Sequence, residues 1–156
     1  MKPQVRVVSR RSFLISSSAA TAALFAAPAL AQMADVENNG WEEAFNALVE
    51  GSEQIDGSPI FVDLPEIAEN GNQVQFSVAV EPIDGVFPKS ASVFVTGNPR
   101  PMVGTFNFFE AMGNASFTSR LRLGQTQDVV FVADMGNGQM AVHKQEVKVT
   151  IGGCGG

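Results

Sequence analysis

The sequence predicts an all-β fold, an immunoglobulin-like antiparallel β-sandwich with one N-terminal helix and a flexible, Gly-rich C-terminal arm. About seven short runs rich in Val and Phe follow residue 57, and Gly, Pro and Asn separate them. No helical pattern lies between these runs, so the crossover helices of a parallel sheet are not expected. The chain then ends in Gly-Gly-Cys-Gly-Gly, a segment with almost no side chains to pack, which indicates an arm outside the sandwich.

The first 31 residues have the pattern of an export signal. Arg10 and Arg11 precede an uncharged run rich in Ala, Ser and Thr, and Ala31 ends a small-residue cleavage site before Gln32. The paired arginines and the mild hydrophobicity indicate the twin-arginine route to the periplasm. A membrane anchor is the alternative, but the run is short and rich in Ala for a span. We therefore expect a signal peptide over 1–31 and cleavage between Ala31 and Gln32.

The remaining chain would be strongly acidic. Four of the ten Lys and Arg side chains lie in the signal, which leaves six basic residues against all 16 acidic ones and a net charge of −10. This charge disfavours nucleic acid and anionic membranes as partners. It also provides no positive net field, so something other than net charge must deliver an anionic substrate.

The first element of the predicted domain, which spans 32–151, is a helix over Asp35–Glu50. Acidic side chains early in this segment suit a helix N-terminus, and Gly51 is a plausible stop. Large apolar side chains recur at helical spacing, namely Trp41, Phe45, Leu48 and Val49. This stripe is expected to pack against the domain rather than to bind a ligand.

The strands follow in order, and their runs are 59–65, 73–80, 90–96, 103–109, 115–123, 127–134 and 139–150. The run 73–80 alternates cleanly, with Val or Phe at every second position from Val74 to Val80. In the run 115–123, the same alternation places Arg120 and Arg122 on the outer side. The run 127–134 is apolar on both faces, which is typical of a central strand.

Cys154 is the only cysteine, so the chain can form no internal disulfide. It stands three residues beyond Ile151, the last apolar residue of the final run, and an extended chain spans about 10 Å over that distance. Glycine lacks a Cβ atom, so the arm would be both narrow and supple. The pattern indicates a thiol that is presented to a cleft in another protein.

Other chemistry has little support in the sequence. One cysteine and one histidine, His143 within a predicted strand, cannot fill a tetrahedral metal site, so no metal is expected. No Lys, Arg or His flanks Cys154, so its thiol should keep a pKa near 8.5 and react slowly unaided. These features favour a carrier over an enzyme. Two alternatives stay open: an exported interaction subunit whose Cys154 forms a lasting intermolecular disulfide, and an autonomous thiol enzyme such as a sulfurtransferase.

The C-terminal sequence VKVTIGGCGG, together with RLRLGQTQDVV and DLPEIAENGN, resembles the SoxY family. These proteins are the sulfur-carrier subunits of the periplasmic thiosulfate-oxidising Sox system. The resemblance covers most of the chain after the signal, and SRRSFL is also usual for the signal of this family. It departs from the family pattern at the Phe-rich segment 101–114, which we expect to pack in the core, with a partner interface as the alternative.

The resemblance implies that Cys154 carries sulfur covalently and that the other residues of 152–156 form a swinging arm, namely Gly152, Gly153, Gly155 and Gly156. It implies a heterodimer with a SoxZ-like subunit and visits to SoxAX-like, SoxB-like and, in some organisms, SoxCD-like enzymes. Those partners would supply haem and manganese, load thiosulfate and release sulfate. This chain would hold no cofactor and would contact no nucleic acid and, after signal removal, no membrane.

Overall fold

The computed structural model describes residues 40–151. The predicted signal peptide and the predicted C-terminal arm, 152–156, lie outside the described residues. Within them the chain forms an α-helix, a short 3-10 helix and nine strands, namely α2 (Trp41–Val49), β1 (Glu53–Asp56), β2 (Ile60–Asp63), β3 (Ile67–Asn70), β4 (Val74–Val80), β5 (Ser90–Val95), β6 (Met102–Asn107), η1 (Glu110–Met112), β7 (Ala115–Leu121), β8 (Gln127–Asp134) and β9 (Gln139–Ile151).

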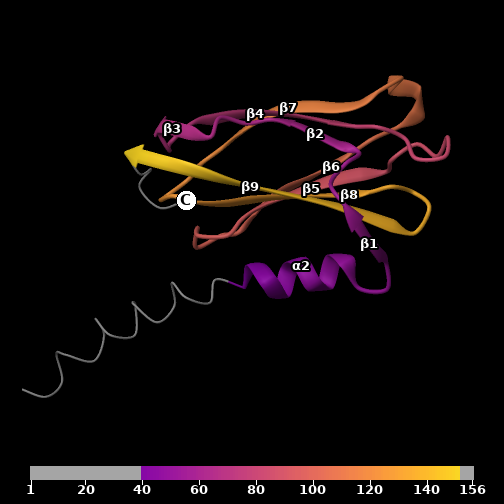
Figure 1. Ribbon diagram of the computed structural model, residues 1–156, viewed down its shortest axis with the longest axis horizontal. Helices are drawn as coiled ribbons and strands as arrows, with labels where there is room; N and C mark the ends of the chain where they lie inside the picture. The colour runs from indigo at the N-terminus through magenta and orange to yellow at the C-terminus, as the bar shows by residue number, and fades with distance from the viewer. Residues whose placement is uncertain (1–39, 152–156) are drawn as a thin grey trace, which may run out of the picture. The chain divides into compact units, whose positions relative to one another are not determined.

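The strands form two layers, which Figure 1 shows one above the other. One sheet has the order β1-β9-β8-β5-β6, with β3 paired to the end of β9, and the other has the order β2-β4-β7. The predicted fold class, a β-sandwich with one N-terminal helix, is confirmed. All seven predicted runs contain a strand.

Two strands were not predicted, and they correct one expectation. β1 and β3 both pair with β9 in parallel, whereas we expected only antiparallel pairing. The other strand pairs are antiparallel. These parallel pairs need no crossover helix. β1 and β3 come early in the chain and β9 comes last, so all the strands between them form the connection. Both strands are short and mostly exposed, and of their side chains only Ile55 and Ala68 pack with the main core, so backbone pairing with β9 is their main contact.

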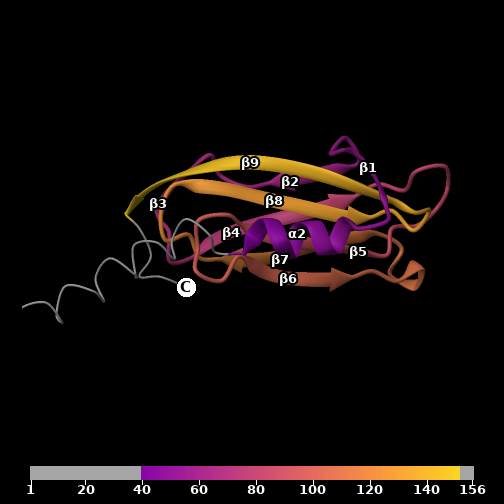
Figure 2. The ribbon, with the colours of Figure 1, turned by 90° about the horizontal axis from the view of Figure 1, so that it is seen from below.

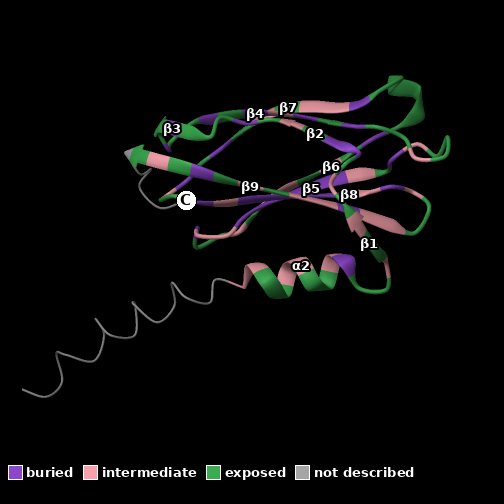
Figure 3. Cartoon of the chain, in the orientation of Figure 1, coloured by how far each residue is buried: buried purple, intermediate pink, exposed green. Residues whose placement is uncertain are grey.

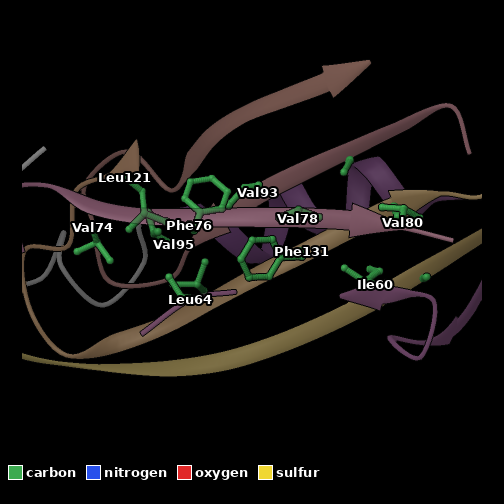
Figure 4. Close-up of a cluster of buried hydrophobic side chains, with 14 of the residues drawn as sticks. Ile60, Leu64, Val74, Phe76, Val78, Val80, Val93, Val95, Leu121 and Phe131 are labelled. Atoms are coloured by element: carbon green, nitrogen blue, oxygen red, sulfur yellow. The ribbon is translucent and has the colours of Figure 1, made fainter. Parts of the chain in front are cut away.

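The main core lies between the two layers, where Figure 3 shows the buried segments of the strands. The predicted alternation in β4 is confirmed because the Val and Phe side chains at every second position from Val74 to Val80 are all buried. Phe76 of β4 and Phe131 of β8 meet across the layers, with ring centroids 5.9 Å apart (Figure 4). Both rings are almost completely buried, so they join the two sheets.

A second apolar cluster lies on the other face of the larger sheet, where α2 packs (Figure 2). Phe45 of the helix meets Phe94 of β5 edge to face, with ring centroids 6.5 Å apart. Val130 and Val132 of β8 also point into this cluster. β8 is therefore buried on both faces, as its sequence predicted, and the helical stripe packs against the domain.

The Phe-rich segment 101–114 divides between core and surface. Phe108 is buried, and Phe106 stacks on Phe117 of β7 with ring centroids 3.8 Å apart. Phe109 and Met112 are exposed, because β6 ends at Asn107 and the chain then turns through η1. The expected core packing is confirmed for the first two phenylalanines only, and the predicted strand over 103–109 begins one residue and ends two residues later than β6.

Candidate functional site

The predicted attachment residue Cys154 and its neighbours Gly152, Gly153, Gly155 and Gly156 lie outside the described residues. So do the signal residues Arg10, Arg11, Ala31 and Gln32. The structure describes the part of the domain from which the C-terminal segment departs. We call it the β9 end; it comprises β3, the last five residues of β9 and the loops at 71–73, 96–101 and 122–126.

Near its end β9 is held on both sides, on the β8 side as far as Val149 and on the β3 side as far as Ile151. On one side, Val147 of β9 lies opposite Gln127 at the start of β8. On the other side, Ile151 of β9 lies opposite Asn70 of β3. Val149 N donates to Thr126 Oγ1 at 3.0 Å, and Thr150 Oγ1 donates to a β3 carbonyl oxygen at 3.0 Å. The predicted arm therefore begins at an anchored residue, and Cys154 can extend about 10 Å from it.

Two buried amide side chains, Asn98 and Gln127, connect the loops of the β9 end. Asn98 Nδ2 donates to the carbonyl oxygen of Arg122 at 2.7 Å, and Asn98 Oδ1 accepts from Gly124 N at 3.0 Å and from Gln127 Nε2 at 2.8 Å. Gln127 Oε1 in turn accepts from Gly97 N at 2.7 Å. We call this set the Asn98–Gln127 network; it joins the 96–101 loop to the 122–127 segment.

Little in the sequence indicates this network. Gly, Asn and Pro in the segment 97–101 predict a turn, but nothing in a single sequence shows that the amide of Asn98 is 5% exposed. Its role follows from tertiary structure, since its partners are more than 20 residues away.

His143 is an ordinary strand residue, as predicted. It lies in β9 opposite Phe131 of β8, with ring centroids 6.2 Å apart. Gly57 lies against the same residue so closely that an added Cβ atom would be 2.7 Å from the His143 Cβ. Residues 40–151 contain no group of three His, Cys, Asp or Glu side chains that could hold a metal ion. The prediction that this chain has no cofactor stays a prediction.

None of the helices in the described part of the chain is long and apolar enough to cross a membrane.

Together, the fold and the C-terminal sequence define a class of small β-sandwich proteins whose last strand leads into a short segment with a single cysteine. A family model described as sulfur oxidation protein SoxY matches residues 45–154. The chain therefore belongs to the SoxY family, and the predicted resemblance is confirmed.

Solved structures agree with this assignment. The chain is similar to the sulfur carrier protein SoxY from Chlorobium limicola f thiosulfatophilum, with 30% identity, a TM-score of 0.60, and coverage of 70% of this chain and 96% of that chain. It is also similar to a candidate superoxide reductase from Thermotoga maritima, with 16% identity, a TM-score of 0.51, and coverage of 65% and 96%. The second likeness concerns the fold alone. No curated protein matches the chain.

Proposed function

We propose that this protein is a periplasmic sulfur carrier of thiosulfate oxidation, which holds sulfur intermediates covalently on Cys154 and presents them to partner enzymes. The observation that carries the proposal is the extent of the family match, which runs through the sandwich and includes Cys154. The similar structure from Chlorobium limicola is itself described as a sulfur carrier protein. The anchored end of β9 adds support, because it gives the cysteine a fixed starting point.

In the proposed cycle, the Cys154 thiolate forms an S–S bond with the terminal sulfur of thiosulfate. A haem-containing SoxAX-like partner takes up the two electrons, and the product is Cys–S–S–SO₃⁻. A SoxB-like manganese hydrolase then adds water at the sulfonate sulfur. Sulfate leaves, two protons are released, and the persulfide Cys–S–S⁻ remains for a further oxidising partner such as a SoxCD-like enzyme.

The chain supplies the thiol, and its partners supply the redox and hydrolytic chemistry. An arm that carries no side chain except the thiol can enter a narrow cleft, because glycine adds no width beyond the backbone. Export through the twin-arginine route lets the chain cross the membrane already folded and paired with a SoxZ-like subunit that lacks a signal. The folded domain then carries the arm, and the reactions of the thiol occur about 10 Å beyond the last strand.

A reconstituted Sox system tests this function with matched variants. Cys154→Ser should abolish thiosulfate-dependent electron transfer to the haem partner and leave the thermal unfolding midpoint unchanged, because the thiol lies beyond the last strand. Gly153→Leu should reduce turnover by widening the arm. Gln73→Leu places the same side chain at an exposed position of the β9 end outside the arm and should leave turnover unchanged.

Full turnover of the Cys154→Ser variant would contradict covalent carriage. Equal turnover of Gly153→Leu and the wild type would contradict a narrow cleft, although carriage itself would stand.

A further inference from the structure

Three arginines lie exposed at or beside the β9 end, and the proposed function does not yet use them. They are Arg100 in the 96–101 loop, Arg120 near the end of β7 and Arg122 in the 122–126 loop. We call them the arginine surface.

Hydrogen bonds place Arg100 and Arg122 on neighbouring segments. The carbonyl oxygen of Arg122 accepts from the Asn98 side chain at 2.7 Å, and Asn98 is two residues before Arg100. A bond of 2.8 Å from Val95 N to the carbonyl oxygen of Pro101 closes the loop that carries Arg100. The Asn98–Gln127 network therefore joins the two backbone segments that carry these arginines.

Alternation along the chain places Arg120 and Arg122 on one side. Leu121 and Leu123 are 3% and 0% exposed, so they face the core, and the arginines between and before them face outward. Residues two apart on an extended segment are roughly 7 Å apart on the same side. Arg120 and Arg122 therefore face the same side, and Arg100 lies on the loop that is hydrogen-bonded to the Arg122 segment.

The arginine surface lies close to the residue from which the C-terminal segment departs. Leu123 N donates to the carbonyl oxygen of Gly71 at 2.8 Å, and the preceding residue Asn70 pairs with Ile151. Two backbone contacts thus connect the Arg122 segment to the end of β9. The path is on the order of 15 Å, and a three-residue arm with an arginine side chain covers that distance.

The local charge of this surface opposes that of the rest of the domain. Residues 40–151 contain 14 Asp and Glu but six Lys and Arg, and three of those six form the arginine surface. Asp128, which lies near this end at the start of β8, is already paired with Lys144 at 2.7 Å. Within the described residues, none of the three arginines forms an ion pair.

We propose that the arginine surface binds a sulfonate- or sulfate-type oxyanion. Guanidinium groups suit such ligands because each can donate two parallel hydrogen bonds to a pair of oxygens. The anion has two possible sources, the sulfonate end of an adduct on Cys154 and a free oxyanion from solution. The first source rests on the proposed function, and the second does not. In either case the surface gives an acidic protein a local positive field toward its anionic substrate.

The test uses the full mature chain, with its SoxZ-like partner if the two copurify, and two thiol reagents that differ in charge. These are 2-sulfonatoethyl methanethiosulfonate, which is anionic, and methyl methanethiosulfonate, which is neutral. At low ionic strength, Arg100→Gln combined with Arg122→Gln should lower the ratio of the anionic to the neutral reaction rate roughly threefold. Lys89→Gln removes one exposed cation at the opposite end of β5 and should leave this ratio unchanged.

The same reagents identify the source of the anion. If the adduct is bound, backbone amide signals of Arg100 and Arg122 should shift between the sulfonate-labelled and the methyl-labelled protein. If a free anion is bound, millimolar sulfate should shift these signals in the methyl-labelled protein, with chloride at equal ionic strength as control.

A shift of these amide signals caused by the adduct or by free sulfate, and absent from the double variant, supports the proposal. A rate ratio that the double variant does not change, together with no shift in either arm, overturns it. No Sox enzyme enters these assays, so they can fail while covalent carriage stands, or succeed while it fails.

Discussion

Replacing Asn98 with alanine should destabilise the whole domain, because one side chain makes three hydrogen bonds in a buried setting. Asn98 is 5% exposed, donates to the Arg122 carbonyl oxygen and accepts from Gly124 N and Gln127 Nε2. A typical hydrogen bond contributes about 1 kcal/mol net, and a buried partner left unsatisfied costs about 1–3 kcal/mol. We therefore expect Asn98→Ala to lower the free energy of unfolding by about 3 kcal/mol.

Thermal unfolding followed by circular dichroism measures this loss. For a domain of this size, about 3 kcal/mol corresponds to a fall in the unfolding midpoint of about 10–15 °C. Asn137→Ala is the matched control: this asparagine lies exposed in the β8–β9 turn and makes two local side-chain bonds, both to Gln139. Its loss should cost less than about 1 kcal/mol. Equal midpoints for the two variants would refute the structural role of the Asn98–Gln127 network.

Three further predictions concern the fold. Gly57→Ala should cost about 1–3 kcal/mol, because its Cβ atom would lie 2.7 Å from a β9 side chain, whereas Gly104→Ala, with 3.9 Å to the nearest atom, should be neutral in the same denaturant titration. Phe131→Ala should cost about 3–5 kcal/mol, since this ring is fully buried between the sheets; a loss below 1 kcal/mol would contradict the described core. Ser58→Ala should raise the pKa of Asp56, which side-chain and backbone hydrogen bonds from Ser58 lower, as an NMR titration would show. Because the folded-state pKa is lowered, that contribution to stability is present above the unfolded-state pKa and is lost as the pH falls through the folded-state value.

Alternating apolar residues made the central strands predictable from the sequence. β4 and β8 bury large side chains at the positions that their patterns indicate, so burial alone specifies them. β1 and β3 could not be predicted in this way because their side chains are mostly exposed. They form only because the 13-residue strand β9 offers them a backbone partner, which is a tertiary property.

The candidate site also has one part that the local sequence predicts and one part that depends on tertiary contacts. The glycine-flanked Cys154 is a local feature, so its sequence and position alone indicated its chemistry, and the same pattern gave the family that the match over 45–154 confirms. The outward direction of Arg120 and Arg122 also followed from alternation. The contact between the Arg122 segment and the loop that carries Arg100 did not, because it depends on a hydrogen bond between residues 24 positions apart.

The central claim is covalent sulfur carriage on Cys154, and the intact mass of the mature protein tests it most directly. The protein would be isolated without reductant from cells supplied with thiosulfate, and its C-terminal peptide would then be fragmented. We predict mass increments of sulfur atoms or of a thiosulfonate group on the peptide that contains Cys154. An unmodified thiol, or a stoichiometric disulfide to another subunit, would contradict carriage and favour an interaction subunit.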